Sequence, residues 1–501
     1  MTDTLAIIPA AIDTYRQPVV YMHEDCHICR SEGFAAQTRI RIDLGSRWLI
    51  ATLNVVMRGG WLNVHAAALS ASAWEALGAS EGDRARFSHP EPPASTSAIR
   101  AKAYDGRLNE ADFAGIVRDT LENRLSDLEL AAFFAACAGE RMDTRETVSL
   151  TRAMQAAGAT LVWGGRAILD KHCVGGLPGN RTTPIVVAIV AAAGHLIPKT
   201  SSRAITSPAG TADTMEVMAP VALDTAALRR VVEAEGGCIV WGGGIHLSPA
   251  DDHFIRIEHV LDFDSTGQLV ASILSKKAAV GATRVLIDIP VGPTAKVRSA
   301  HAARVLGSML ISVAEAIGLH VELHRSDGSA PVGRGIGPVL EAMDVLAVLR
   351  RNADAPADLR TRAIDLAGKL LDMASGSGLR SGRDLAQSLL DSGAAEAKFM
   401  AICAAQGGFR EPAPAFQSTE ITAPTAGKVA AFNNRLIARV AKLAGAPRQK
   451  SAGVRLLVRS GDRVEAGEPL YEIHAETPGE LKYARSYAES QPDIVTLSES
   501  G

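Results

Sequence analysis

Short apolar runs separated by helical stretches constrain the fold of this chain more than any other feature. Val285–Ile289 and Cys238–Trp241 are almost continuously apolar, and a further apolar run, Ile185–Ala193, has the length of a helix. Strands that are apolar on both sides belong to a sheet that helices cover on both faces. The alternation continues through His320–Leu323, so it predicts a large mixed-sheet α/β domain over residues 161–410.

Residues 1–90 show a different pattern, in which apolar and polar residues alternate. Thr38–Ile42 and Trp48–Val56 are examples, and such alternation with β-branched residues is typical of half-buried strands. We therefore predict a small N-terminal β-rich domain. The segment Ser88–Ser97, which carries three prolines, is expected to be a linker.

Two more regions are distinguished by their periodicity. Residues 95–160 carry apolar residues at helical spacing, and Ser126 and Asp143 stand where helices are expected to begin, which predicts a helical domain. Residues 420–501 contain short apolar runs and turns with glycine, which indicate a small β-sandwich or hammerhead-like part.

The composition excludes several classes of protein. The chain has 501 residues, more than one core normally holds, so we expect several domains. A formal net charge of −3 and an aromatic content of 4% give no basis for a nucleic-acid partner. The N-terminus lacks a signal-peptide pattern and no apolar run is long enough to cross a membrane, so we expect a cytoplasmic protein without a membrane partner.

Cys26 and Cys29 are spaced like half of a zinc site or a redox pair, with His23 and His27 nearby. A tetrahedral zinc site needs a second pair of ligands at comparable spacing, and none follows in the sequence. We therefore expect structural or incidental thiols and no metal.

Residues 170–216 contain five glycines, four cations and many hydroxyl groups. Glycine lets the backbone bring its N–H groups against a ligand, and a helix N-terminus behind such a turn attracts anions. Lys171 precedes its glycines, unlike the lysine of a Walker loop, and the glycine spacing differs from the dinucleotide fingerprint. A βα connection that needs small residues for packing is the alternative, but two such turns around one helix favour an oxyanion site.

The first of these turns, Lys171–Gly176, reads Lys-His-Cys-Val-Gly-Gly and resembles the Lys-His-Ser-Thr-Gly-Gly turn of the thymidine phosphorylase and AMP phosphorylase family. The second turn, Ser201–Ser207, resembles that of the AMP branch, where the thymidine enzymes have Ser-Gly-Arg-Gly. The similarity covers about residues 95–501, and an N-terminal extension also belongs to the AMP branch.

The resemblance adds detail to the expected architecture. It implies that residues 1–90 form a small β-barrel-like module that promotes assembly. It implies that the helical domain at 95–160 is joined by a later helical segment near 250–280, and that residues 420–501 form a C-terminal α+β subdomain. A homodimer or larger homo-oligomer is expected.

The resemblance also implies the site residues. The positions that match phosphate ligands are Lys171, Cys173 (in place of a serine), Thr183, Ser201 and Thr211. The positions that match contacts to the nucleoside or nucleotide are Gly176, Ser202, Arg203, Ala204, Ile205, Thr206, Ser207, Ser272, Lys276 and Lys296. On a helix Ser272 and Lys276 share one face, because they are four residues apart.

One departure from the family concerns the base. The thymidine enzymes carry an arginine upstream of the matching serine, and in an ungapped alignment that place holds Ile257, with Arg256 beside it. Pyrimidine recognition is therefore in doubt. Arg203 and Lys296 add positive charge that a second phosphate, such as a nucleotide 5′-phosphate, would use.

The implied reaction is phosphorolysis of an N-glycosidic bond, in which bound phosphate attacks ribose C1′ while the base leaves. The leaving base needs a proton or a strong hydrogen bond. His172 matches the candidate of the thymidine enzymes and Asp264 that of the AMP enzymes, and both stay open. The implied chemistry requires no cofactor or metal. Inorganic phosphate enters it as a substrate.

Two alternatives remain. An anthranilate phosphoribosyltransferase-like enzyme would require magnesium and diphosphate ligands, and no acidic magnesium motif is evident. A non-enzymatic phosphoribosyl-binding protein could use the same fold, although the presence of Lys171, Ser272 and Lys276 argues against it.

Overall fold

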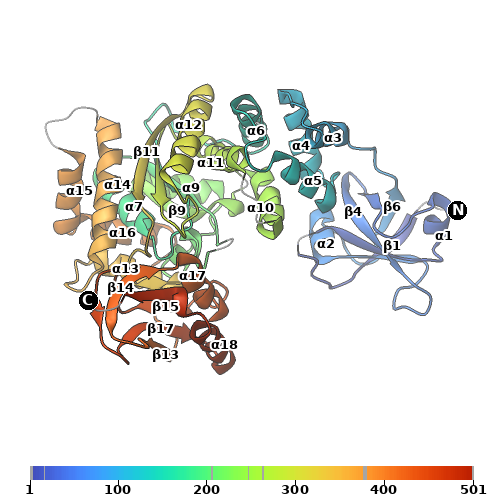
Figure 1. Ribbon diagram of the computed structural model, residues 1–501. Coiled ribbons are helices and arrows are strands. Elements are labelled where there is room, and N and C mark those ends of the chain that lie inside the picture. The colour runs from blue at the N-terminus through green and yellow to red at the C-terminus, as the bar shows by residue number, and fades with distance from the viewer. Residues whose placement is uncertain are drawn as a thin grey trace. The chain divides into compact units, whose positions relative to one another are not determined.

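The computed structural model describes residues 4–15, 17–204, 207–245, 247–261, 265–375 and 381–498 (Figure 1). The chain forms two compact units. The first contains Met1–Ala153 and Ala250–Ser265, and the second contains Met154–Pro249 and Thr266–Gly501. The predicted multi-domain α/β architecture is confirmed, with a β-rich part, a helical part, an α/β part and a C-terminal part.

The β-rich part is a closed six-stranded barrel with strand order β1-β5-β2-β4-β3-β6. Its strands alternate as the sequence predicts: Ile40 and Ile42 are fully buried, whereas Arg39 and Arg41 reach the surface. Closure pairs every strand on both sides, so no edge is left open. The elements are β1 (Thr4–Pro9), β2 (Val19–His23), α1 (His27–Glu32), β3 (Arg39–Leu44), β4 (Arg47–Val56), β5 (Ala66–Leu69), α2 (Ala71–Leu77) and β6 (Arg84–Ser88).

Cys26 and Cys29 have a structural role at the start of α1. Cys26 is the N-cap residue, and its sulfur accepts a hydrogen bond from the Cys29 backbone N–H at 3.1 Å. Both residues are buried in the barrel core. The Cys26 sulfur takes the place of the hydroxyl or carboxylate that usually caps a helix.

The helical part of the first unit packs around four phenylalanines. Phe133 and Phe134 meet Phe113 and Phe254 with ring centroids 5.3–6.4 Å apart. Phe254 belongs to the later helical segment, which therefore shares a core with the earlier helices. The helices are α3 (Ser95–Ala103), α4 (Glu110–Leu121), α5 (Asp127–Cys137), α6 (Thr144–Ala156) and α10 (Pro249–Leu261).

The second unit contains the sheet that the apolar runs predict. β11, β10 and β7 pair in parallel in that order, β8 pairs in parallel with β9, and a bridge between Ile168 and Leu196 joins the two sets. Helices α11 and α12 cover one face, and α7 and α14 cover the other (Figure 1). The strands are β7 (Leu169–Cys173), β8 (Ile197–Ser201), β9 (Gly237–Trp241), β10 (Arg284–Val291) and β11 (His320–Asp327).

Helix α7 (Thr182–Ala192) contains most of the apolar run predicted as a helix. All of its residues from Ile185 to Val190 are completely buried, because the sheet lies on one side and α14 and α16 on the other. The remaining helices are α8 (Thr211–Glu216), α9 (Thr225–Glu235), α11 (Thr266–Ala279), α12 (Ala300–Ala316), α13 (Pro338–Leu349), α14 (Ala357–Ser375), α15 (Gly382–Asp391) and α16 (Ala394–Ala405), with a 3₁₀ turn at Gly242–Gly244.

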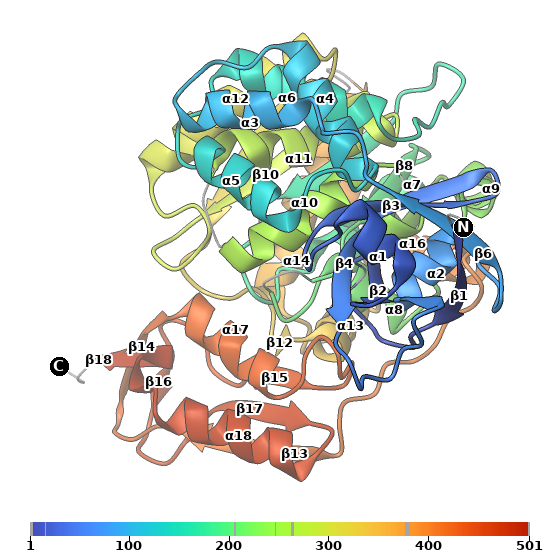
Figure 2. The same ribbon diagram turned by 90° about the vertical axis from the view of Figure 1, so that its right-hand side faces the viewer.

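The C-terminal part packs α17 and α18 against antiparallel strands (Figure 2). Its larger sheet has the order β12-β15-β17-β13, and β12 comes from the loop before α13, so the body of the unit supplies an edge strand. The elements are β12 (Gly335–Ile336), β13 (Gln417–Thr422), β14 (Gly427–Phe432), α17 (Asn434–Leu443), β15 (Gly453–Leu456), β16 (Arg463–Val464), β17 (Pro469–Ala475), α18 (Pro478–Glu489), a 3₁₀ turn (Pro492–Ile494) and β18 (Val495–Ser498). In the described part of the chain, no helix is long and apolar enough to cross a membrane.

Candidate active site

Strand β7 sends the candidate residues to opposite faces of the sheet. Lys171 points to the α7 face, where its Nζ donates to Thr182 Oγ1 at 2.7 Å. Asp170 points to the other face, where its carboxylate binds Lys277 of α11 at 2.8 Å. Because side chains alternate along a strand, His172 shares the α11 face with Asp170. The phosphate candidates and His172 therefore leave the strand in different directions.

Lys171 is a buried cation that bonds to hydroxyl groups. Its side chain is 1% exposed, and its second bond goes to Thr183 Oγ1 at 3.4 Å. Among the described residues no carboxylate lies within ion-pair distance of its amine. Burial lowers the pKa of Lys171, because the loss of water outweighs the attraction of the nearby Asp288 carboxylate.

Two further polar groups near this strand end can donate a hydrogen bond to an anion: the Ser201 hydroxyl and the Cys173 thiol. Ser201 ends β8, and its hydroxyl is buried without a partner among the described residues. The Cys173 sulfur accepts a hydrogen bond from Asn180 Nδ2 at 3.4 Å, and burial raises the pKa of the Cys173 thiol to about 11. The thiol is thus neutral, so it can donate a weak hydrogen bond where the family has a serine.

Beneath the strand end lies a buried ion triad that sequence reasoning missed. The Asp170 carboxylate pairs with Lys199 at 3.1 Å and with Lys277 at 2.8 Å, and all three side chains are at most 6% exposed. Burial opposes ionisation of Asp170, but the two ammonium groups outweigh it and lower its pKa. Lys199 also donates to the Lys171 carbonyl at 2.7 Å, which fixes the backbone that carries the first turn.

The two lysines of this triad also affect the protonation of His172. Burial, with the positive charges of Lys277 and Lys199, lowers the pKa of His172 well below its usual value. The imidazole is therefore neutral at pH 7 and can donate or accept a hydrogen bond, but it is not charged.

Asp213 holds the second turn closed. Its carboxylate accepts the Ala204 N–H at 2.6 Å and the Gly210 N–H at 3.0 Å. A Cβ atom on Gly210 would lie 2.6 Å from the Ala204 nitrogen and 2.7 Å from the Ser202 oxygen, so only glycine fits this approach. Within the turn, the Ser207 hydroxyl donates to the Ala209 carbonyl at 2.9 Å.

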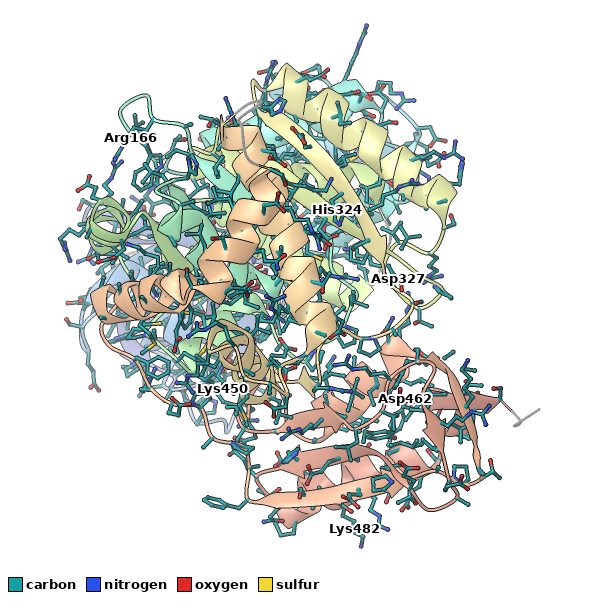
Figure 3. The ribbon with its side chains drawn as sticks, turned by 90° about the vertical axis from the view of Figure 1, so that its left-hand side faces the viewer. Arg166, His324, Asp327, Lys450, Asp462 and Lys482 are labelled. Carbon is teal, nitrogen blue, oxygen red and sulfur yellow. The ribbon has the colours of Figure 1, made fainter. Side chains whose placement is uncertain are left out.

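Arg203 anchors this turn to neighbouring acids. Its guanidinium binds both oxygens of Glu216, at 2.6 and 2.7 Å, and Asp213 at 3.3 Å. It also lies over the Trp241 ring, 5.0 Å from the centroid. Lys450, labelled in Figure 3, binds the same two carboxylates, at 3.0 and 3.1 Å. The positive charge of Arg203 is therefore already balanced inside the protein.

The base-recognition candidates lie on α11 as predicted from their spacing. Lys276 Nζ donates to Ser272 Oγ at 3.1 Å, so the two side chains share one face of the helix. Gly176 packs against the backbone of Lys296, because a Cβ atom on Gly176 would collide with the Lys296 nitrogen. The exposed Lys296 thus lies beside the first turn.

Several predicted residues lie elsewhere or outside the described part of the chain. Asp264, Ile205 and Thr206 fall outside the described residues. Arg256 lies in the first unit, where it binds Asp127 at 2.7 Å, and Ile257 is buried there.

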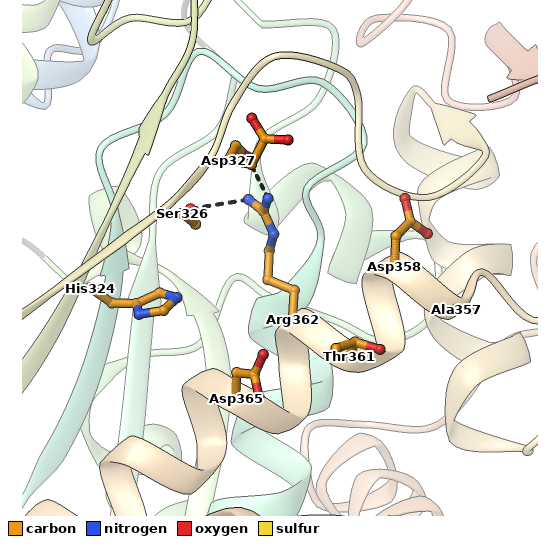
Figure 4. Close-up of a pocket in the computed structure, with 8 residues that line it drawn as sticks. All are labelled: His324, Ser326, Asp327, Ala357, Asp358, Thr361, Arg362 and Asp365. Atoms are coloured by element: carbon orange, nitrogen blue, oxygen red, sulfur yellow. Dashed lines mark hydrogen bonds between the residues drawn. The ribbon is translucent and has the colours of Figure 1, made fainter. Parts of the chain in front are cut away.

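A cavity of about 470 Å³ lies between β11 and α14 (Figure 4). Its Ser326 donates to Asp288, which pairs with Cys173 in the sheet, so the cavity adjoins the candidate site. Arg362 crosses it to Ser326 Oγ at 3.2 Å and to the Asp327 carbonyl. Its carboxylates already have partners: Asp327 binds Ser329, Asp365 binds Arg383, and Asp358 accepts the Gly333 N–H. The charges that line this cavity are therefore satisfied by the protein.

Comparison with known proteins assigns families to three regions. The α/β domain of the glycosyl transferase family matches residues 165–396, and the helical bundle domain of that family matches residues 96–158. The C-terminal domain of pyrimidine nucleoside phosphorylases matches residues 428–494. Anthranilate phosphoribosyltransferase from Thermus thermophilus superposes with a TM-score of 0.50 at 20% identity, over 62% of this chain and 99% of that one, which shows a shared fold.

Relatives match over nearly the whole length. A protein of Polaromonas sp. strain JS666 named "Putative thymidine phosphorylase" is 57% identical over 488 residues, 97% of this chain and 95% of the relative. "Putative thymidine phosphorylase 1" of Acidovorax sp. strain JS42 is 58% identical over the same coverage. A protein of Hahella chejuensis with the same kind of name is 54% identical over 97% of this chain and 96% of its own. The chain therefore belongs to the thymidine phosphorylase family of pentosyltransferases.

Proposed function

We propose that the protein cleaves the N-glycosidic bond of a nucleoside or nucleoside 5′-monophosphate with inorganic phosphate. The observation that carries this is the buried Lys171 amine, which bonds to Thr182 and Thr183 at the start of α7. Ser201 adds a buried hydroxyl without a protein partner among the described residues. A buried cation among hydroxyl donors at a helix N-terminus suits an oxyanion.

In the proposed reaction, a phosphate oxygen forms a bond to ribose C1′ as the bond from C1′ to the base nitrogen breaks. The electron pair leaves with the base, which then takes up a proton. His172 is neutral at pH 7, so we assign it a hydrogen bond to the base. We assign the proton to Asp264, which stays a prediction.

We propose a nucleoside 5′-monophosphate as the preferred substrate. The exposed Lys296 next to Gly176 supports this preference, because it adds a cation beside the first turn. Arg203 contributes less than its position in the sequence predicts, since Glu216 and Asp213 balance its charge. The product would be the free base and ribose 1,5-bisphosphate.

Release of free base from thymidine, uridine, AMP, CMP and UMP, each with and without phosphate, tests the proposal. We expect phosphate-dependent release from monophosphates, with Lys296→Ala raising the KM for the monophosphate. Release from thymidine or uridine at equal or higher kcat/KM would instead favour the nucleoside. If no substrate releases base, a phosphoribosyl-binding protein becomes the better hypothesis.

The second enzyme candidate, a phosphoribosyltransferase, is separated by its metal requirement. We propose that the reaction proceeds without metal, so activity should survive excess EDTA. Loss of activity with EDTA and its recovery with magnesium would favour the phosphoribosyltransferase. We also propose a homodimer or larger homo-oligomer, which light scattering would measure.

A further inference from the structure

Arg181 connects the two turns of the candidate phosphate site. It lies five residues after the first turn (Lys171–Gly176), directly precedes α7 as its N-cap residue and is 12% exposed. Its Nη1 donates to Thr211 Oγ1 at 2.8 Å, and its Nη2 donates to the Ala209 carbonyl at 3.0 Å. Thr211 begins α8, and Ala209 lies between the second turn and that helix. A single side chain therefore joins the start of α7 to the start of α8, the two helices that follow the turns.

The third contact of Arg181 ties this connection to the body of the unit. Its Nε donates to Glu341 Oε2 at 2.6 Å, and Glu341 is 1% exposed. The carboxylate also accepts the Thr214 hydroxyl at 3.2 Å and the Gly337 N–H at 3.3 Å. Glu341 thus receives bonds from the N-cap residue of α7, from α8 and from the start of α13, so its position is set by three elements.

We infer that Arg181 is a positioning residue for the phosphate site, which it assembles by holding Thr211 against the start of α7, where Lys171 binds Thr182 and Thr183, with Glu341 as its anchor. The inference rests on the proposed function, because it takes Thr211 as a phosphate ligand. Arg181 itself need not contact phosphate, because its Nε, Nη1 and Nη2 atoms all donate to protein oxygens.

Arginine is needed for this role because its planar fork presents several donors at fixed angles. A lysine at the position would keep the charge but could not reach Glu341, Thr211 and the Ala209 carbonyl together. Arg181→Lys is therefore the sharpest variant, and Glu341→Gln, which is nearly isosteric, tests the anchor without altering the turn. Arg350→Lys is the matched control, since Arg350 binds Glu411 through two bonds of 2.7 Å at the surface.

The experiment measures steady-state kinetics with phosphate and with the nucleotide varied in turn, and thermal shift with inorganic phosphate alone. Arg181→Lys should raise the KM for phosphate by about 10- to 100-fold, the effect of losing one charge-assisted hydrogen bond. It should change the nucleotide KM by less than about threefold. Glu341→Gln should shift the phosphate KM in the same direction, and Arg350→Lys should leave both constants unchanged.

A double-mutant cycle with Thr211→Val separates positioning from direct binding. If Arg181 acts through Thr211, the double variant should have the phosphate KM of Thr211→Val alone. Multiplied effects would show that Arg181 binds phosphate directly and would overturn the inference, as would an unchanged phosphate KM in Arg181→Lys. The native protein separates this failure from that of the proposed function: if phosphate neither shifts its melting temperature nor supports cleavage, the proposed function itself fails.

Discussion

Asp170 balances two buried lysines beneath the first turn, and its removal should be costly. Asp170→Asn would leave Lys199 and Lys277 without their shared anion in a fully buried site. Breaking a buried pair from one side typically costs about 3–5 kcal/mol, which corresponds to a fall of about 4–7 °C in the unfolding midpoint of a unit of this size. Calorimetry measures the effect, with Asp391→Asn, which removes an exposed ion pair with Arg360, as the control. Equal midpoints for the two variants would contradict the argument.

Histidines that the fold keeps neutral should make stability depend on pH. Burial lowers the pKa of His172, His195 and His324 below the usual value of 6.5. Below pH 6.5 the unfolded chain binds protons that the folded chain does not, so this stability is complete above pH 6.5 and is lost as the pH falls. We expect the unfolding midpoint to drop between pH 6.5 and 5, and His172→Gln to flatten the drop.

The control for this pH dependence is His320→Gln, because His320 is an exposed residue of β11. Its profile should match that of the native protein. A native midpoint that stays constant from pH 7 to 5 would show that the neutral histidines contribute nothing to stability.

At the scale of elements, the second turn depends on a close backbone approach at Gly210. The φ of Gly210 is −97°, which any residue adopts, so the effect of a substitution is purely steric. A methyl group would meet the Ala204 nitrogen and the Ser202 oxygen, and the turn would have to open. We expect Gly210→Ala to raise the phosphate KM at least about tenfold and to cost about 1–3 kcal/mol of stability.

The control for Gly210→Ala is Gly115→Ala in α4. There a methyl group meets only the Ser95 Cβ, at 3.9 Å, and alanine favours a helix. This variant should keep native kinetics and gain slightly in stability. If both alanine variants have native phosphate KM values, the close approach in the second turn has no bearing on phosphate binding.

Local patterns predicted the elements of this fold well, whereas contacts between distant residues were beyond them. The apolar runs became α7 and the parallel strands because burial on both faces leaves a direct trace in composition. Nothing in the sequence marks Lys277 as buried, because a lysine in a helix is usually exposed. It meets Asp170 only because α11 packs on the face of β7 to which Asp170 points. Arg181 and Glu341 are 160 positions apart, so only the packing of α13 brings them together.

The charges of Arg203 illustrate the same limit within the candidate site. The sequence predicts a free cation for a second phosphate, because Arg203 stands among hydroxyls and glycines. Folding instead places Glu216 and Asp213 on the guanidinium, and Lys450 binds the same oxygens of both carboxylates. A count of cations in a segment predicts an anion site, but it does not show which cations the protein has already neutralised.

At the scale of the second unit, the C-terminal part supports the phosphate site through α13. Strand β15 pairs with β12, which leads directly into α13, and the Val339 N–H donates to the Lys450 carbonyl at 3.1 Å. Helix α13 carries Glu341, the anchor of Arg181. The C-terminal part therefore helps to place Glu341, and through it Arg181, by way of the short strand β12 and helix α13.

Gly453→Ala tests this connection. Gly453 begins β15, and its Cα lies so close to β12 that an added Cβ atom would collide with the Ile336 carbonyl oxygen. The two strands would have to separate, at a cost of about 1–3 kcal/mol, and the start of α13 would move with β12. We expect a lower unfolding midpoint together with a raised phosphate KM. Gly479→Ala in α18, where a methyl group meets nothing within 4 Å, should leave the phosphate KM unchanged and should not lower the midpoint, since alanine favours a helix. A lower midpoint with an unchanged phosphate KM would mean that the C-terminal part stabilises the unit without positioning Glu341.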